Sequence, residues 1–371
     1  MPDVPTLRVS VMEGEGAYGR HSRIPAAGGG MAIPMLEDAA RRIALEAGGR
    51  PIVIADYGSS DGKNSLAPMR AAITVLRERI GRERPIIVCH TDLPGNDFST
   101  LIGLIDSDPE SYGRDDPAVF PYAMGRSFYR SVFPPTHVDL GWSSYAAVWL
   151  SQIPRQIPDH FFIPCCTGRV RAEFDRQAAL DWEAFLALRA SELRRGGRLV
   201  VALPSLAHDG SIYSAPLMDH ANAALAELVD AGVVSTEERS RMTIASCPRR
   251  ERDLLAPFAE SGQFKGLTVE HVSTCDIPDG MWIDYERDGD ATALASKRAL
   301  FFRVIFVPSI VQALAASRSG EERRAFADRL EEGMRRRLAR APARMNSLVG
   351  IIVLAKQSAP KRRKGQAAPR A

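Results

Sequence analysis

The stretch that decides the fold runs from residue 54 to residue 66 and reads IADYGSSDGKNSL. The apolar run PIVIA, at 51–55, leads into it and predicts a buried strand. Behind it, apolar residues recur at the spacing of a helix face, at Leu66, Met69, Ile73, Leu76 and Ile80. The stretch therefore predicts a strand that turns into a helix, which is where doubly wound α/β folds bind nucleotide-like ligands.

The glycine spacing of this turn separates three classes of ligand. A phosphate-binding P-loop needs four residues between its glycine and its Gly-Lys pair, whereas Gly58 and Gly62 enclose three and Asn64 follows Lys63. The dinucleotide pattern G-x-G-x-x-G is absent because Ser60 stands at its second glycine. The remaining pattern, D-x-G-x-x-x-G-x-N, suits a ligand with an amine and hydroxyls and no phosphate. S-adenosylmethionine (SAM) is such a ligand.

A second predicted strand, PIIVCHTDL at 85–93, contains Asp92, 36 residues after Asp56. In a doubly wound sheet an acid at the end of the second strand reaches ribose hydroxyls. The alternative is a helix cap ahead of PGNDFSTLIGLI, at 94–105. Two acids at the ends of two successive strands favour the ligand-binding interpretation.

The rest of the chain alternates between predicted strands and helices. Residues 138–154 predict a strand followed by a helix that ends at Pro154, and 181–205 predict a helix, a Gly-Gly turn and a strand. Residues 106–123 are rich in Asp, Pro, Gly and Ser and predict a surface loop. The fold class is therefore α/β, with a doubly wound, Rossmann-like core and a largely parallel sheet.

Composition excludes several function classes. The chain has 371 residues, 45% of them hydrophobic, enough for a large core. Its net charge is +3, of which the last eleven residues supply +5, so the body carries −2 and does not predict a nucleic-acid binder. No apolar run reaches the length of a membrane span and no apolar signal core opens the chain, so we expect a cytoplasmic protein. The five cysteines form no C-x-x-C pair, which predicts no metal site.

Five segments carry a resemblance to a known family. They are MEGEGAYGRHS at 12–22, IADYGSSDGKNSL, TDLPGNDF at 91–98, GRSFYRSVFPP at 125–135 and SSYAAVWLSQIP at 143–154. In order and spacing they resemble the SABATH methyltransferases, which transfer a methyl group from SAM to small carboxylic acids or, in some plant members, to xanthine nitrogens. The resemblance covers most of the chain and implies a class I methyltransferase core with a mainly helical cap.

The resemblance places eight residues around the cofactor. Asp56 is expected to bind the methionine ammonium, and Asp92 to accept both ribose hydroxyls. Adenine would lie between Leu93 and Phe128, whose apolar surfaces suit its faces. The full set is Ser22, Asp56, Gly58, Asn64, Asp92, Leu93, Ser127 and Phe128.

The acceptor pocket is expected at Tyr145, Val148 and Trp149. Tyr145 and Trp149 lie four residues apart, on one face of the predicted helix, and the Trp149 indole N–H would orient the acceptor carboxylate. Pro25 stands where the family commonly has a carboxylate-binding glutamine, so this half of the carboxylate site is unaccounted for. RMTIASCP, at 241–248, lacks the acidic stretch that some members associate with magnesium, which again predicts no metal. The three glycines at 28–30 predict a flexible lid segment.

These boundaries divide the chain into four parts. Residues 1–205 form the N-terminal segment and SAM-binding core, 206–265 a helical cap over the acceptor pocket, 266–358 the rest of the core with further helices and a closing strand, and 359–371 a disordered basic tail. An apolar stripe in the last predicted helix is expected to be core packing. It consists of Phe326, Leu330, Met334 and Leu338.

The predicted reaction is an in-line methyl transfer from SAM to a carboxylate. A carboxylic acid with a pKa near ~4 is already ionised at neutral pH, so no general base is needed. A medium-chain fatty acid or a benzoate- or salicylate-like acid is the expected acceptor, and a homodimer the expected assembly. Two alternatives stay open: N-methylation of a heterocycle, and a SAM-binding regulatory protein without catalysis, which Pro25 favours.

Overall fold

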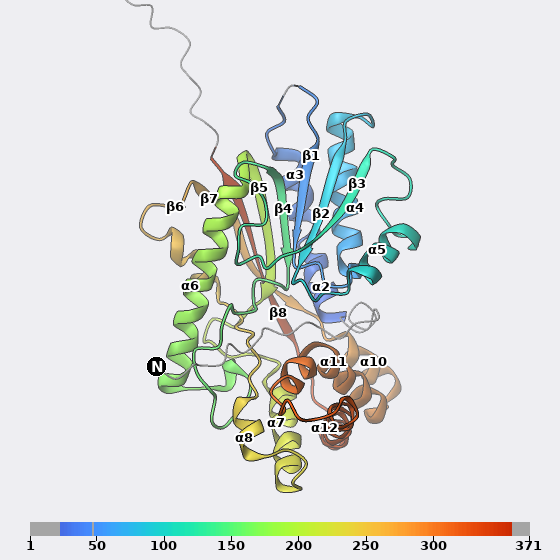
Figure 1. Ribbon diagram of the computed structural model, residues 1–371, viewed down its shortest axis with the longest axis vertical. Helices are drawn as coiled ribbons and strands as arrows, with labels where there is room; N and C mark the ends of the chain where they lie inside the picture. The colour runs from blue at the N-terminus through green and yellow to red at the C-terminus, as the bar shows by residue number, and fades with distance from the viewer. Residues whose placement is uncertain (1–22, 47, 358–371) are drawn as a thin grey trace, which may run out of the picture.

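The computed structural model describes residues 23–46 and 48–357. Its centre is an eight-stranded sheet in the order β3-β2-β1-β4-β5-β8-β7-β6 (Figure 1). The strands are β1 (Ile52–Tyr57), β2 (Ile86–Asp92), β3 (Val119–Gly125), β4 (Val138–Ser144), β5 (Leu193–Pro204), β6 (Gln263–Phe264), β7 (Leu267–Ile277) and β8 (Ser347–Lys356).

The first five strands pair in parallel with one another, and every pairing that involves β6, β7 or β8 is antiparallel. β1 pairs in parallel with β2 and β4, β2 with β3, and β4 with β5. The closing strand β8 lies antiparallel between β5 and β7. The doubly wound α/β prediction is confirmed, and the crossing from β1 to β4 places the switch in strand order beside the turn at Gly58.

Alternate residues of each central strand enter two different cores. Ile52 and Ile54 pack with helices α3 and α4, whereas Val53 and Ala55 pack with α6. Strands buried on both faces read as unbroken apolar runs, as in PIVIA. The helices of the sheet layers are α2 (Arg23–Met31), α3 (Ile33–Arg42), α4 (Lys63–Ile80), α5 (Phe98–Ser107), α6 (Gly168–Glu192) and α9 (Glu251–Leu255), with short 3₁₀ turns η1 (Ile163–Cys165) and η2 (Ala256–Phe258).

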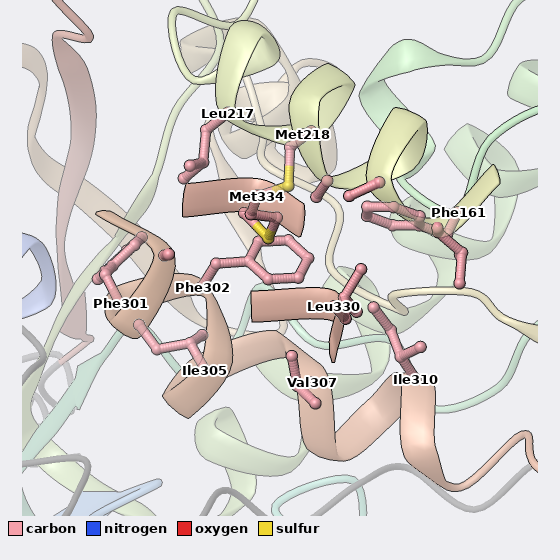
Figure 2. Close-up of a cluster of buried hydrophobic side chains, with 14 of the residues drawn as sticks. Phe161, Leu217, Met218, Phe301, Phe302, Ile305, Val307, Ile310, Leu330 and Met334 are labelled. Carbon is pink, nitrogen blue, oxygen red and sulfur yellow. The ribbon is translucent and has the colours of Figure 1, made fainter. Parts of the chain in front are cut away.

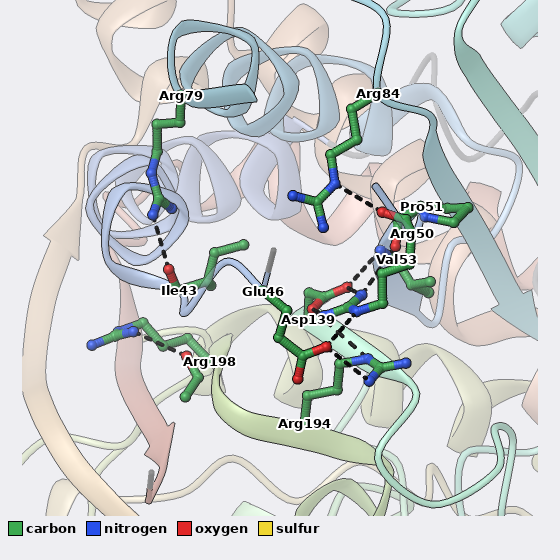
Figure 3. A network of polar contacts seen from close by, with 11 residues as sticks. Ile43, Glu46, Arg50, Pro51, Val53, Arg79, Arg84, Asp139, Arg194 and Arg198 are labelled. Carbon is green, nitrogen blue, oxygen red and sulfur yellow. Dashed lines mark hydrogen bonds and ion pairs between the residues drawn. The ribbon is translucent and has the colours of Figure 1, made fainter. Parts of the chain in front are cut away.

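An ion pair between the partly exposed Arg50 and the buried Asp139 ties the amino ends of β1 and β4 together. Arg50 donates to both oxygens of Asp139, at 2.6 and 2.9 Å, and Val53 N–H donates to the same carboxylate at 2.9 Å. Figure 3 shows this network with Glu46 and Arg194 beside it. Because parallel strands share their direction, the network lies at the end of the sheet opposite Gly58. It stabilises the scaffold and leaves the carboxyl ends of the strands to form the site.

A second core is built by helices at one end of the sheet (Figure 1). Figure 2 shows Phe161, Leu217, Phe302 and Met334 packed together there. The predicted stripe of the last helix is buried in this core, as expected. Its helices are α7 (Ala215–Asp230), α8 (Thr236–Arg241), α10 (Gly280–Asp288), α11 (Ala291–Val311) and α12 (Gly320–Arg340). The helices of this second core, which form the cap, come from two stretches of the chain, whereas the sequence predicts a cap formed by residues 206–265 alone.

Local predictions failed at three other places. Part of the predicted loop at 106–123 is edge strand β3, which pairs with β2. The Gly-Gly pair at 196–197 lies in an irregular part of β5, where the register with β4 jumps from Leu193 to Arg198 and Gly196 has a φ of 77°, so the strand begins ahead of the glycines and not after them. The glycines at 28–30 belong to helix α2, with Gly28 and Gly29 buried, and do not form a loop. In each case a neighbouring element supplies contacts that residue composition alone does not reveal.

The segment after β4 is not the helix that the sequence predicted. Tyr145 has a φ of 58°, and Trp149 forms an isolated antiparallel bridge with Ser246. Leu150 N–H donates to the Ala245 carbonyl at 2.8 Å. Backbone hydrogen bonds to residues 245–247 thus replace those of a helix.

No helix in the described ranges, 23–46 and 48–357, has the length and apolar character needed to cross a bilayer.

Candidate functional site

The turn after β1 is held close to the end of β2. Gly58 and Ser59 N–H groups both donate to the Thr91 carbonyl, at 2.8 and 3.1 Å. Gly58 has a φ of 90°, and a Cβ atom there would lie 2.1 Å from the Ala146 Cβ atom. Only glycine fits this position, because both the backbone conformation and the packing exclude a side chain.

A cavity of about 780 Å³ opens at this turn. Its volume lies within the range of small-molecule sites. The walls come from the ends of β1, β2, β3 and β4 and the loops that follow them. The predicted site residues that line it are Gly58, Asp92, Leu93, Ser127, Phe128, Tyr145 and Trp149.

Asp92 presents its carboxylate at the rim of the turn. Ser60 N–H donates to Oδ2 at 2.8 Å and Leu93 N–H to Oδ1 at 2.7 Å. Burial raises the pKa of Asp92 above its usual range, and the two backbone donors partly oppose this. Each oxygen still has a lone pair for another donor, so the geometry allows two hydroxyls to bind.

Phe128 forms an aromatic wall of the same cavity. Its ring centroid lies 4.8 Å from that of Tyr129 and 5.8 Å from that of Phe185. The buried Arg189 donates to the Phe128 carbonyl at 2.9 Å and thereby fixes the backbone. Leu93 lines the same cavity, as the predicted adenine site requires.

Asp56 and Asn64 do not line the cavity. Asp56 is buried, and its Oδ2 accepts from Ser65 Oγ at 2.6 Å and lies 2.8 Å from His90 Nδ1. This carboxylate joins the first turn of α4 to β2. Its role toward an ammonium group stays a prediction, as does the role of Asn64. Ser22 lies outside the described residues.

A second cavity, of about 120 Å³, shares Tyr145 and Trp149 with the first. Its walls are mostly apolar and include Val148 and Pro25. The carbonyl oxygen of Trp149 accepts from Tyr129 Oη at 2.6 Å, which holds its backbone. The indole N–H of Trp149 makes no hydrogen bond to any described residue. Tyr145 and Trp149 therefore stand at the junction of the two cavities, although they do not share a helix face.

Tyr145 is in a strained conformation at this junction. A positive φ is rare outside glycine, and Tyr145, at 58°, is bulky. Such strain is concentrated at functional sites. Gly28 of α2 makes room for the phenol, since a Cβ atom there would lie 2.1 Å from Tyr145 Oη. Helix α2 is thus fitted against the junction.

Several residues of the site escaped sequence analysis. Ser60, Asn96 and Tyr129 line the first cavity, and Asn96 Nδ2 donates to the Ser60 carbonyl at 2.7 Å. The motif TDLPGNDF contains Asn96 and could have indicated it. Arg298 and Asp279 line the second cavity, and no local pattern marks either residue.

Among the described residues one cluster has metal-ligand spacing, at His160, Cys165 and Asp219. Its histidine is poorly suited to bind an ion. Nδ1 of His160 accepts from the N–H groups of Phe161 and Phe162, at 3.0 and 2.9 Å, so Nε2 carries the ring proton. Burial also raises the pKa of Cys165 to about 12, which keeps the thiol protonated. The segment 241–248, where some family members have an acidic stretch associated with magnesium, forms backbone hydrogen bonds with the chain that follows Tyr145.

Comparison with known proteins places this geometry in context. The sequence profile of a family described as SAM dependent carboxyl methyltransferase matches residues 7–357. Methyltransferase LUC1 of Fusarium sp is 30% identical over 240 residues, which are 63% of this chain and 62% of that protein. Salicylate carboxymethyltransferase of Clarkia breweri is 28% identical over 250 residues, which are 64% of this chain and 67% of that protein. The chain therefore spans about three fifths to two thirds of the length of these relatives.

The fold has a solved counterpart. A structure of loganic acid methyltransferase with SAH superimposes with a TM-score of 0.74 and 21% identity, covering 94% of this chain and 99% of the other. At this level of identity the likeness concerns the fold, and it agrees with the sheet order and the helical layer described above.

Proposed function

Because the chain belongs to the SAM-dependent carboxyl methyltransferase family, we propose that it transfers a methyl group from SAM to the carboxylate of a small carboxylic acid. One observation carries this proposal. A larger cavity lined by Asp92 and a smaller, mostly apolar cavity meet at Tyr145 and Trp149. Two ligands bound in these cavities would touch at the junction, as a group transfer requires.

The residues of the larger cavity fit SAM. Asp92 would accept the ribose hydroxyls, and Leu93 and Phe128 would cover adenine. When bound, SAM would supply a methyl group on a positively charged sulfur. SAM would bind beside the turn at Gly58, whose glycine spacing does not match a phosphate-binding loop.

The protein's own residues have a limited chemical task. The acceptor acid is ionised at neutral pH, so no side chain needs to remove a proton. Trp149 would donate its indole N–H to one carboxylate oxygen and so aim the other at the junction. The apolar walls of the smaller cavity exclude water and hold the acceptor body.

The smaller cavity favours a compact acceptor. A cavity of 150 Å³ in another protein holds a benzene molecule, so about 120 Å³ suits a single ring or a short chain. A medium-chain fatty acid would require the cavity to widen. The relative named for salicylate supports the same choice. We therefore favour a benzoate- or salicylate-like acid over a fatty acid.

Pro25 supports a second candidate, a SAM-binding protein without catalysis. It lines the smaller cavity and has no side-chain donor for a carboxylate. A single assay separates the candidates: purified protein, SAM labelled in the methyl group, and a panel of benzoate, salicylate, octanoate and xanthine. Labelled esters of the ring acids are expected. Labelled xanthine would indicate N-methylation, and SAH binding without any labelled product would support the non-catalytic candidate.

Assembly and location remain predictions. The edge strand β3 exposes Phe120 and Tyr122, with 44% and 54% of their surfaces accessible. An exposed edge with apolar side chains offers a pairing surface for a second copy, which supports the proposed homodimer. The basic tail at 359–371 lies outside the described residues.

A further inference from the structure

The smaller cavity contains one buried ion pair in an otherwise mostly apolar wall. Arg298 of α11 and Asp279, the residue that caps α10, both line it. Their side chains are 2.7 Å apart, from Arg298 Nη2 to Asp279 Oδ2. Arg298 is only 4% exposed. A charged pair is costly to bury, so its remaining hydrogen-bonding capacity matters.

The carboxylate of Asp279 accepts three hydrogen bonds from the protein. Its Oδ1 accepts from Trp282 N–H at 3.0 Å, and its Oδ2 accepts from Met345 N–H at 2.8 Å in addition to Arg298. These bonds fix the start of α10 and the segment ahead of β8. Asp279 therefore has a structural role and little capacity left for a ligand.

The guanidinium of Arg298 is only partly used. It donates from Nη2 to Asp279 and from Nη1 to the Ala343 carbonyl, at 2.5 Å. A guanidinium has five N–H donors, and no other bond to a described residue involves Arg298. Within the part of the chain that the structure describes, donors therefore remain uncommitted on a buried side chain that borders the smaller cavity. Burial also lowers the pKa of Arg298, in keeping with a poorly solvated charge.

The position of Arg298 assigns these donors to a particular part of the acceptor. Tyr145 and Trp149 border both cavities, whereas Arg298 borders only the smaller one. The carboxylate to be methylated belongs at the junction, so Arg298 faces the body of the acceptor. Since Asp279 already neutralises the guanidinium, a second carboxylate would bring an uncompensated charge into an apolar cavity. A neutral hydroxyl or carbonyl oxygen would bring no such charge into the cavity.

We propose that Arg298 is a specificity-determining residue that binds a neutral oxygen on the acceptor, so that the preferred substrate is a hydroxy- or oxo-substituted carboxylic acid of single-ring size. This proposal rests on the proposed function, because it takes the smaller cavity as the acceptor site. It narrows the acceptor class: plain hydrocarbon acids and dicarboxylic acids should both bind less well than the matched hydroxy or oxo acid.

Matched acids test the proposal on the wild-type protein. The pairs are 3- and 4-hydroxybenzoate against 3- and 4-methylbenzoate, which differ by a hydroxyl in place of a methyl group. Calorimetry in the presence of SAH measures their binding whether or not turnover occurs. At least one hydroxy acid should bind about tenfold more tightly than its methyl counterpart, the scale of a hydrogen bond to a charged group. Benzene-1,4-dicarboxylate should bind more weakly than both.

Two variants separate recognition from packing. Arg298→Lys keeps a cation opposite Asp279 but removes the planar, multiply donating group, so the hydroxy-over-methyl preference should fall toward unity. Arg303→Lys is the matched control on the same helix, because Arg303 pairs with Asp328 and Glu331 and does not line the cavity. It should keep the preference.

The outcomes are distinct. Equal binding of hydroxy and methyl acids by the wild type would overturn the proposal, and so would an Arg298→Lys variant that weakens both acids equally. A clear binding preference without any methyl ester would overturn the proposed function and leave Arg298 as a recognition residue. If neither acid binds, the proposal for Arg298 fails, and the assay with labelled SAM and the wider panel of acids still tests the proposed function by itself.

Discussion

Gly28→Ala is the substitution whose effect follows most directly from the structure. Gly28 lies in helix α2, buried against the ring of Tyr145. A Cβ atom at this position would lie 2.1 Å from Tyr145 Oη and 2.8 Å from two ring carbons. Since Cβ contacts shorter than 3.0 Å are essentially never found, either the phenol or the helix must move by about 1 Å.

Two opposing terms set the change in stability. Alanine in a helix interior is favoured over glycine by about 0.5–1 kcal/mol. Overpacking costs about 1–3 kcal/mol. Gly28→Ala should therefore lower the free energy of unfolding by up to about 2.5 kcal/mol, or leave it nearly unchanged if the ring moves freely. Activity should suffer more, because a 1 Å displacement at a reacting site can cost about a hundredfold in rate.

The same helix supplies the control. Gly30 is exposed, and a Cβ atom there would meet nothing within 4 Å. Gly30→Ala should gain about 0.5–1 kcal/mol of stability and keep wild-type kcat/KM. Denaturant unfolding and methyl-ester formation, measured on both variants, separate the helix-propensity effect from the contact with Tyr145.

The result that refutes this reasoning is a Gly28→Ala protein as active as Gly30→Ala on the best acceptor. Tyr145 would then tolerate displacement, and its place at the junction of the two cavities would have no bearing on the reaction. A loss of activity in both variants would instead implicate helix α2 as a whole.

Three further outcomes are expected. Trp149→Phe should lower kcat/KM about tenfold to a hundredfold with little change in SAH affinity, because a hydrogen-bond donor to a charged carboxylate is lost. Trp282→Phe is the control and should keep kcat/KM, since the indole N–H of Trp282 donates to Glu286. Equal activity of both variants would contradict a role for the Trp149 indole. Asp92→Ala should abolish tight SAH binding in calorimetry, and unchanged affinity in this variant would contradict the ribose-binding role. Acidification should weaken SAH binding to the wild type at a higher pH than an ordinary aspartate would give, because burial raises the pKa of Asp92. Catalytic efficiency toward a carboxylic acid should be flat from about pH 6 to 9, since the acceptor is ionised throughout; a tenfold rise per pH unit toward alkaline pH would reveal a general base.

The sequence alone determined the elements whose signals are local. An apolar run, two glycines and a helical stripe are sufficient to predict β1, the turn and α4, and in the structure the run is buried and both glycines have a positive φ. Because parallel strands end at one edge of a sheet, Asp92 at the end of the second strand was placed correctly beside that turn. The closing strand and the apolar stripe of the last helix were also predicted from local signals, because a run or a regular spacing of apolar residues shows which positions are buried.

Tertiary structure decided what depends on partners distant in sequence. Residues 145–151 do not form a helix, and Val148 and Leu150 instead form backbone hydrogen bonds with Cys247 and Ala245, about a hundred positions away. The glycines at 28–30 are flexible as isolated residues, yet two of them are buried in α2 against β4 and the residue that follows it. In the sequence nothing distinguishes Arg298 from the other arginines. In the structure its hydrogen bonds to Asp279 and Ala343 hold it beside the smaller cavity. Local patterns report propensity and burial, whereas the identity of a contact across the fold is set only when the chain is packed.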